Sequence, residues 1–285
     1  MNIISALRHI AAAAAVAALI VGCGGNDDEV AVSQVSYTSL SATAPLEVPA
    51  ELRLPAGSKL PAVVVVHGSS GIDSRGKFHI EALNKAGIAT LEIDMWKARG
   101  ITGAAGRPAG VPETLPDAYG ALAYLARQGR IDPSRIGIMG FSWGGVVSML
   151  TATKPYTDQY MGGTRQFKAH APFYPVCWVY NRVPGYAFAS FTGAPVFIQG
   201  GELDTYDLPD TCPKLVAATQ AAAPGIASVT MYPGATHAFD RNEPEITVND
   251  PFSHLGAGGL VTFTYNPVAA AKARDAVVAF FVAKL

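Results

Sequence analysis

Residues 136–145 read Ile136-Gly137-Ile138-Met139-Gly140-Phe141-Ser142-Trp143-Gly144-Gly145, and this stretch decides the fold. An apolar run ends directly in the pattern Gly-x-Ser-x-Gly, and residues 143–150 then suit a helix. Between a buried strand and a helix, this pattern predicts a strained turn that lifts the serine hydroxyl above a sheet. Glycines suit the turn because side chains two positions either side of Ser142 would collide. The alternative is a turn whose small residues only let a helix pack closely on a strand, but the context favours Ser142 as a nucleophile.

Apolar runs and helical windows alternate on both sides of this turn. The expected strands are residues 62–66, 88–93, 135–139, 168–174, 194–199 and 228–232, and the expected helices are residues 74–86, 113–128, 143–150, 213–222 and 267–285. This alternation predicts an α/β fold, in which a mostly parallel twisted sheet carries helices on both faces. Residues 33–61 alternate in shorter runs broken by prolines and predict an edge hairpin. No repeat or shift in composition divides the chain, so residues 33–285 are expected to form a single domain.

Composition narrows the class of protein. The 285 residues include 21 basic and 22 acidic side chains, for a net charge of −1, and 49% are hydrophobic. Only 15% are charged, against about 25% in an average globular protein. This balance excludes a disordered chain and, without a basic stripe, argues against nucleic acid as the main partner. What remains is a well-buried globular domain of the kind that enzymes use.

The first residues have the pattern of a bacterial export signal. A basic residue precedes an unbroken apolar run at 10–21, which is shorter than the roughly 20 residues that a membrane span requires. Ile20-Val21-Gly22-Cys23 looks like a lipobox, after which Cys23 would become a lipidated N-terminus. We therefore expect residues 1–22 to be a signal peptide and residues 23–32 a lipid-anchored tether, on the periplasmic side of the envelope or at the cell surface. The alternative is a simple secretory cleavage that leaves the protein free in the periplasm or secreted.

Two further cysteines, Cys177 and Cys212, would face an oxidising compartment after export, where disulfides persist. The sequence allows a Cys177–Cys212 disulfide or two separate buried thiols. It does not choose between them, because it gives no distance between the two residues.

A serine nucleophile needs a base, and the base needs an acid that orients it. In this kind of fold the three follow in the order Ser, Asp or Glu, His, at strand ends. Asp204 lies just past the expected strand 194–199, and His237 lies just past the expected strand 228–232. The predicted triad is therefore Ser142, Asp204 and His237.

Other residues could fill these roles. Glu202, Asp207 and Asp210 are competing acids on the same loop as Asp204. The other histidines of the domain are His67, His79, His170 and His254. His237 is preferred because it alone follows Ser142 and Asp204 at a strand end.

Two backbone amides are expected to stabilise the oxyanion. One is the N–H of Trp143, at the beginning of the expected helix, where the helix dipole is positive. The other is the N–H of Ser69 in His67-Gly68-Ser69-Ser70-Gly71, at the end of the strand 62–66. His67 itself suits a role in stabilising this turn.

Taken together, these residues resemble the dienelactone hydrolase branch of the α/β-hydrolases, over residues 62–285. The motifs that carry the resemblance are His67-Gly68-Ser69-Ser70-Gly71, Asp94 with Arg99-Gly100, Gly140-Phe141-Ser142-Trp143-Gly144-Gly145, Asp204, His237-Ala238-Phe239 and Phe280-Phe281. The resemblance implies the α/β-hydrolase fold and hydrolysis of esters or lactones. The founding enzymes use a cysteine where this chain has Ser142 and a glutamate where it has Gly68, which implies an ordinary serine esterase here.

The resemblance also implies two arginines that bind a substrate carboxylate. Arg241 stands four residues after the predicted catalytic histidine. Arg99 follows the second core strand, one residue further along than in the family. A guanidinium can hold a carboxylate with two parallel hydrogen bonds. The alternative is a pair of surface arginines in salt bridges, such as Arg241 with Glu243 or Asp240.

No cofactor or metal is expected, because residues 71–78 only partly match a phosphate-binding loop and there is no paired-histidine motif. Residues 240–265, with prolines and several glycines, are expected to form a loop that walls the pocket. The sequence thus predicts a serine hydrolase acting on small-molecule esters, carboxylate-bearing esters or lactones. The alternatives are a catalytically idle envelope lipoprotein that uses the fold for binding, and an acyl transferase or amidase.

Overall fold

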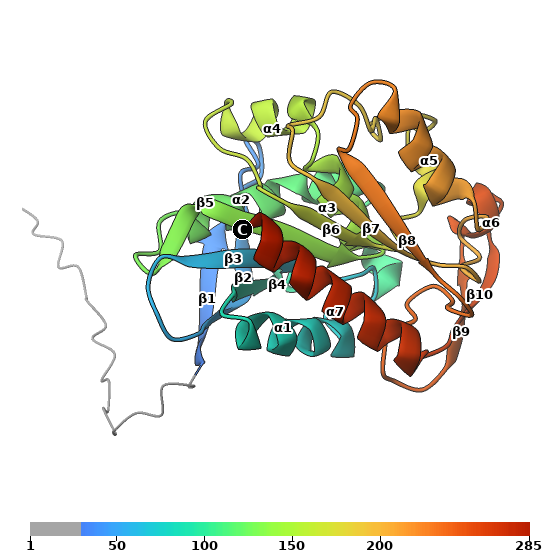
Figure 1. The fold of residues 1–285 in the computed structure, drawn as a ribbon, viewed down its shortest axis with the longest axis horizontal. Helices are drawn as coiled ribbons and strands as arrows, with labels where there is room; N and C mark the ends of the chain where they lie inside the picture. The colour runs from blue at the N-terminus through green and yellow to red at the C-terminus, as the bar shows by residue number, and fades with distance from the viewer. Residues whose placement is uncertain (1–29) are drawn as a thin grey trace, which may run out of the picture.

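The computed structural model describes residues 30–285 (Figure 1). The expected signal peptide, Cys23 and most of the expected tether therefore lie outside the described residues. Among residues 30–285, no helix is both long and apolar enough to cross a membrane.

An eight-stranded sheet runs through the molecule in the order β1-β2-β4-β3-β5-β6-β7-β8. Its strands are β1 (Ala31–Thr38), β2 (Glu47–Leu54), β3 (Leu60–Val66), β4 (Ala89–Ile93), β5 (Ile131–Phe141), β6 (His170–Phe173), β7 (Val196–Gly201) and β8 (Ala227–Tyr232). β2 pairs antiparallel with β1 and β4, and every pair from β4 to β8 is parallel. The predicted α/β fold is confirmed, and its N-terminal hairpin forms the sheet edge.

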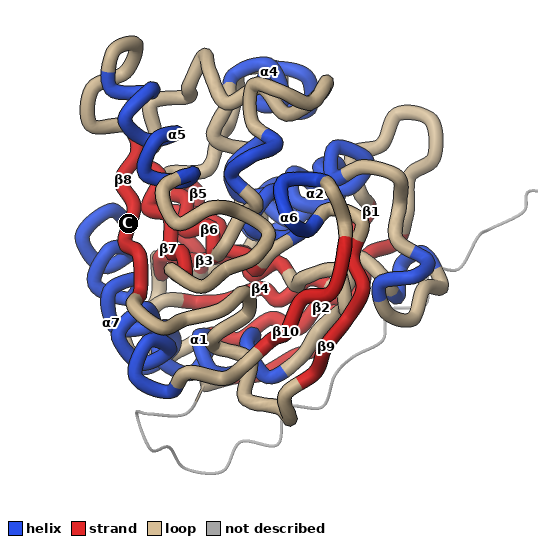
Figure 2. Tube along the Cα trace, turned by 90° about the vertical axis from the view of Figure 1, so that its right-hand side faces the viewer, coloured by secondary structure: helices blue, strands red, loops and turns tan. Residues whose placement is uncertain are grey.

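Helices cover both faces of this sheet because its central strands are apolar on both sides. Successive valines of β3 point to opposite faces, and Val63, Val64, Val65 and Val66 are all completely buried. One face packs on α1 (Ser74–Lys85) and α7 (Pro267–Lys284). The other packs on α2 (Leu115–Leu125), α3 (Trp143–Leu150) and α5 (Thr211–Gln220). Figure 2 shows α1 and α7 together on one side of the strands.

Two regions differ from what the sequence patterns predict. A further helix, α4 (Lys154–Met161), follows α3 in a segment too polar to be recognised as helical. Residues 240–265 are not simply a loop, because β9 (Ile246–Asp250) and β10 (Gly259–Phe263) pair antiparallel outside the main sheet. A short turn, α6 (Ser253–Gly256), lies between them. The alternation of apolar and polar residues in β9 is the signal that could have found this ribbon.

The chain between β4 and α2 follows three short 3₁₀ turns. They are η1 (Lys97–Arg99), η2 (Ala104–Gly106) and η3 (Val111–Thr114). A fourth, η4 (Cys177–Val179), follows β6. These turns lie past the carboxyl ends of parallel strands, which is where α/β sheets bind ligands. Side chains of η3 and η4 line the candidate site.

Candidate active site

Ser142 stands on the sharp turn between β5 and α3. Its backbone has φ 50° and ψ −107°, a region that residues other than glycine rarely adopt. A Cβ atom at Gly140 would lie 2.3 Å from the carbonyl oxygen of Gly144, and one at Gly144 would lie 2.1 Å from the carbonyl oxygen of Val66. The glycines of the motif are thus required by backbone packing, and this packing holds the serine in its strained position.

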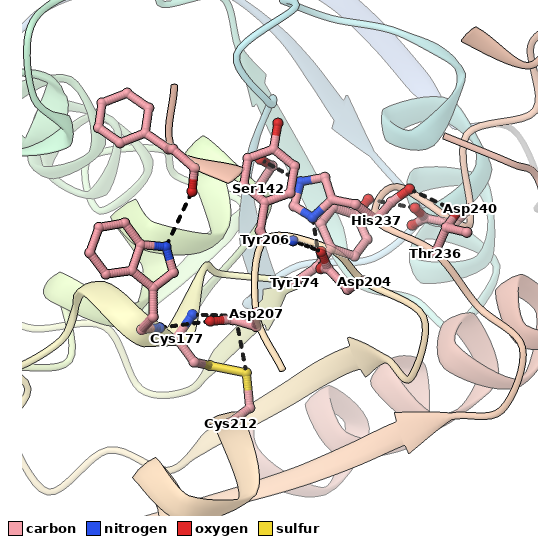
Figure 3. Close-up of polar contacts among 12 residues, drawn as sticks. Ser142, Tyr174, Cys177, Asp204, Tyr206, Asp207, Cys212, Thr236, His237 and Asp240 are labelled. Atoms are coloured by element: carbon pink, nitrogen blue, oxygen red, sulfur yellow. Dashed lines mark hydrogen bonds and ion pairs between the residues drawn. A yellow bond between two sulfur atoms is a disulfide. The ribbon is translucent and has the colours of Figure 1, made fainter. Parts of the chain in front are cut away.

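The structure brings Ser142, His237 and Asp204 into one hydrogen-bonded chain (Figure 3). The Nε2 atom of His237 lies 2.8 Å from Ser142 Oγ, and its Nδ1 atom lies 2.8 Å from Asp204 Oδ2. The backbone N–H of Tyr206 donates to the other oxygen of Asp204 at 2.8 Å and so fixes the carboxylate. His237 is only 1% exposed. This geometry is that of a nucleophile, a base and an acid that orients the base.

The competing acids are used elsewhere. Glu202 is exposed, and Asp210 forms a surface ion pair with Lys214. Asp207 accepts the backbone N–H groups of Cys177 and Trp178, at 2.6 and 2.8 Å. Asp204 is the acid that the structure places against His237.

Two tyrosines enclose the imidazole of His237. The ring centroids of Tyr174 and Tyr206 lie 4.7 and 4.1 Å from that of His237. Phe263 of β10 lies near the same ring, with centroids 5.5 Å apart. Aromatic walls on more than one side restrict how far the imidazole can turn, so its two hydrogen bonds keep their directions.

Behind Tyr174 lies a buried polar network. The Tyr174 hydroxyl donates to Asp240 Oδ1 at 2.5 Å, and His79 Nε2 lies 2.8 Å from Asp240 Oδ2. The guanidinium of Arg75, itself 4% exposed, donates to the Tyr174 hydroxyl and pairs with Asp73. Burial alone would raise the pKa of Asp240, but the hydrogen bond from His79 and the charges of His79 and Arg75 outweigh it and hold this pKa below its ordinary value.

The loop after β3 is fixed by His67 and Trp96. His67 Nε2 accepts the backbone N–H of Met95 at 3.1 Å, and Trp96 Nε1 donates to the carbonyl oxygen of Ser69 at 2.8 Å. Burial lowers the pKa of His67 to about 4, so its ring is neutral near pH 7 and suits the turn-stabilising role predicted for it. Arg75 fills the space beside Gly68, since a Cβ there would lie 2.9 Å from Arg75 Nη2. A side chain at position 68 would therefore require the guanidinium of Arg75 to shift.

A cavity of about 410 Å³ opens beside Ser142. Ser69 and Trp143 line it together with the nucleophile. Trp143 is the first residue of α3, so its N–H has no acceptor within the helix. The two residues predicted to supply the oxyanion amides therefore meet at the same cavity as Ser142.

The structure does not bring the two expected carboxylate-binding arginines to this cavity. Arg99 donates to the buried carboxylate of Asp117 at 2.5 Å and to the carbonyl oxygen of Met95 at 3.0 Å. Burial nevertheless raises the pKa of Asp117 to about 6. Arg241 Nη1 donates to the carbonyl oxygen of Pro244, and its Nε pairs with Glu243 at 3.3 Å. Neither arginine is among the described residues that line the cavity, because each is turned toward local partners instead.

A different arginine lines the cavity. Arg107 follows η2, and Asp250 ends β9. Sequence reasoning missed this pair, because the two residues are far apart along the chain and lie in segments expected to be irregular. Tyr174 and Tyr206 were missed for a similar reason, since an isolated tyrosine after a strand carries no signal of which ring it will contact.

The structure joins Cys177 and Cys212 in a disulfide that ties η4 to α5 (Figure 3). Asp207 lies against it, with the carboxylate 3.9 Å from Cys212 Sγ. These three side chains are close enough to share a metal ion, but metal-binding cysteines use free thiolates, and both sulfurs here are in the disulfide. The cluster is therefore a crosslink rather than a metal site.

The sequence model of the dienelactone hydrolase family matches residues 48–285. An uncharacterized protein of Mycobacterium tuberculosis is 29% identical over 201 residues, which are 67% of this chain and 66% of that protein. The chain thus spans slightly less than two thirds of the length of this curated relative.

Solved structures agree on the fold. A dienelactone hydrolase-like promiscuous phosphotriesterase from metagenomic libraries is 20% identical, with a TM-score of 0.64 and coverage of 90% of this chain and 98% of that one. Thermogutta terrifontis esterase 2, phosphorylated by paraoxon, is 17% identical, with a TM-score of 0.60 and coverage of 90% and 94%. At these identities the likeness shows a shared α/β-hydrolase fold.

Proposed function

Since this chain belongs to the dienelactone hydrolase family, we propose that it is a hydrolase that cleaves carboxylic esters with Ser142 as its nucleophile. The observation that carries this proposal is the chain of two 2.8 Å hydrogen bonds from Ser142 through His237 to Asp204. The strained backbone of Ser142 at the end of β5 supports it, because such strain concentrates at functional positions.

The proposed reaction begins with His237 Nε2 taking the proton of Ser142 Oγ as that oxygen attacks the ester carbonyl carbon. The N–H groups of Trp143 and Ser69 hold the oxyanion of the tetrahedral intermediate. Asp204 stabilises the imidazolium, which then gives its proton to the departing alcohol. Water repeats the sequence on the acyl-enzyme, with His237 again as base, and releases the carboxylic acid and free Ser142.

Hydrolysis of 4-nitrophenyl acetate and butyrate tests the proposal. Ser142→Ala should lower kcat/KM by about 10⁴-fold or more, because the triad acts as one unit. Asp204→Asn should lower it by about 10⁴-fold, because the base loses its orientation. Ser70→Ala is the matched control, since Ser70 is exposed on the Ser69 loop and lies outside the triad; its rate should stay within about twofold of the wild type. If Ser142→Ala, correctly folded, retained wild-type turnover, the proposed nucleophile would be wrong.

We also propose that the protein is exported and lipidated at Cys23. The lipobox-like sequence motivates this, and the Cys177–Cys212 disulfide supports an oxidising compartment. Mass spectrometry of the N-terminal peptide from the native host should find a diacylglyceryl-modified Cys23. Detergent should then be needed to extract the protein, whereas Cys23→Ser should appear in the soluble fraction. An unmodified mature N-terminus at another residue would overturn the lipid anchor.

A further inference from the structure

The walls of the cavity beside Ser142 are mainly apolar, and aromatic rings stand among the aliphatic side chains. Four of the rings belong to Trp143, Trp178, Tyr206 and Phe252. Both indole N–H groups are already donated, by Trp143 to Thr114 Oγ1 at 3.0 Å and by Trp178 to the carbonyl oxygen of Phe252 at 3.2 Å. These side chains therefore present flat apolar surfaces, which suit a planar apolar group.

Arg107 and Asp250 bring charge to this cavity, but they neutralise each other. Nη1 of Arg107 lies 3.0 Å from Oδ2 of Asp250, and Nη2 lies 3.3 Å from Oδ1. Their side chains are only 13% and 10% exposed. The guanidinium also lies over the rings of Trp143 and Phe252, 6.0 and 5.2 Å from their centroids. Both carboxylate oxygens of Asp250 face the Nη1/Nη2 edge of the guanidinium, so this edge is occupied and the charge of Arg107 is already neutralised.

Besides this ion pair, the charged residue on the cavity wall is Glu113, whose side chain, like that of Asp250, is negative. Glu113 accepts the backbone N–H of Gly110 at 2.9 Å, at the beginning of η3. A second anion in the cavity would thus meet Asp250 and Glu113, with no unpaired cation on the described wall to offset them.

We propose that this cavity binds an uncharged aromatic group of the ester, and that the Arg107–Asp250 pair makes the site reject carboxylate-bearing substrates. This inference rests on the proposed ester hydrolysis. A substrate carboxylate would have to displace Asp250 from Arg107 or share this one cation with it, and either arrangement places two anions beside a single positive charge in a poorly hydrated place. Asp250 therefore acts as a specificity-determining residue by occupying the arginine that would otherwise attract the anion.

The size of the cavity agrees with an aromatic rather than a small aliphatic group. Its 410 Å³ lies within the range of roughly 300–1,000 Å³ found for pockets that bury drug-sized ligands. An acetyl group would leave most of the aromatic surface uncovered. Binding energy from a ring could instead be used to hold the ester carbonyl against Ser142.

Two matched pairs of substrates test the proposal, one for each side of the ester bond. On the acyl side, 4-nitrophenyl 4-methylbenzoate is compared with 4-nitrophenyl 4-carboxybenzoate. On the alcohol side, 4-methylbenzyl acetate is compared with 4-carboxybenzyl acetate. Each kcat/KM is divided by the rate of hydroxide hydrolysis of the same ester, so that intrinsic reactivity cancels. For the pair whose ring enters the cavity, the full-length protein should prefer the methyl member by at least about 100-fold.

Three variants alter the charge of the cavity. In Asp250→Asn, Arg107 loses its partner and should accept the carboxylate, so the preference for the methyl ester should fall at least about tenfold. In Arg107→Met, Asp250 is unpaired and the preference should be at least as large as in the wild type. The double variant removes both charges and should also keep the preference, because no cation is then available. Thermal melting of each variant checks that it is folded.

Loss of the preference in Asp250→Asn alone supports the proposal. A wild-type enzyme that hydrolyses both members of both pairs equally, or a folded Asp250→Asn with an unchanged preference, overturns it. Failure of the proposed function is a different result, in which 4-nitrophenyl acetate is not hydrolysed either and Ser142→Ala equals the wild type.

Discussion

Two tyrosine–aspartate pairs flank His237, and they differ in what lies beyond them. On one side Tyr174 donates to Asp240, which is completely buried and also bonded to His79. On the other side Tyr206 lies beside Asp250. Burial of Tyr206 raises its pKa above the ordinary value, and the negative charge of Asp250 raises this pKa further. The first pair faces the protein interior, whereas the second lines the cavity.

This difference assigns the two networks different tasks. Both position the imidazole ring, since each tyrosine contacts it. A substrate can reach only the second network, because Asp240 and His79 have essentially no exposed surface. Changes to the first should therefore appear mainly in stability, and changes to the second mainly in substrate choice.

The largest expected loss of unfolding free energy is from Asp240→Asn. Removing this charge leaves His79 and Arg75 facing a neutral amide in the interior, which should cost about 3–5 kcal/mol of unfolding free energy. Asp250→Asn, in the cavity-facing network, should cost about 1–2 kcal/mol. Urea unfolding followed by circular dichroism measures both. Equal losses for the two variants would contradict the division between an interior and a cavity-facing network.

The next largest loss of unfolding free energy is expected when the disulfide is removed, because it links η4, next to the cavity, to α5. It links residues 35 apart in the sequence, so Cys177→Ala with Cys212→Ala should lower the unfolding free energy by roughly 2–4 kcal/mol. The neighbouring Trp178 of η4 lines the cavity, so the preference for aromatic esters should also weaken. An unchanged urea midpoint would show that the disulfide does not stabilise the protein.

The smallest expected effect is a pH dependence from Asp207. Burial, and then the nearby charge of Asp204, raises its pKa to about 7. Between about pH 4 and pH 7 this carboxyl binds more protons in the folded protein than in the unfolded chain, so its contribution to stability falls as pH rises and is lost above pH 7. Relative to the wild type, Asp207→Asn should gain on the order of 1–2 kcal/mol of stability between pH 5 and pH 8, because partial exposure reduces the full linkage energy.

The control for that measurement is Asp210→Asn. Asp210 lies three residues away but forms an exposed pair with Lys214, so this change should leave the pH dependence as it is in the wild type. Asp240 has the opposite sign, because its lowered pKa means that its contribution is lost as pH falls below about 4. A pH dependence of stability that is the same in Asp207→Asn as in the wild type would contradict the raised pKa of Asp207.

Sequence patterns predicted the parts of the molecule that depend on local structure. The strand before Ser142 and the helix after it follow from an apolar run and a glycine-rich turn, and both are fixed by contacts within a few residues. The loops carrying Asp204 and His237 follow from the ends of two parallel strands. In such a sheet the ends meet at one edge, so chain order was enough to place the residues there.

The cavity wall could not be predicted in the same way. Arg99 was expected at the cavity, but Arg107 lies there, because the path of three short 3₁₀ turns decides which arginine faces inward. Asp250 meets Arg107 across 143 residues of sequence. Such long-range pairs follow from how loops pack, and neither periodicity nor spacing within one sequence contains that information.

Fluorophosphonate labelling of the purified protein, with peptide mass spectrometry of the adduct, tests the role of Ser142 without any assumption about substrate. An activated serine should form a covalent phosphonyl bond, and the label should lie on the peptide that contains Gly140-Phe141-Ser142-Trp143. The label should be absent from Ser142→Ala and greatly slowed in Asp204→Asn, while Ser70→Ala should react as the wild type does. A folded wild-type protein that stays unlabelled, or a label on a different serine that persists in Ser142→Ala, would contradict a catalytic triad of Ser142, His237 and Asp204.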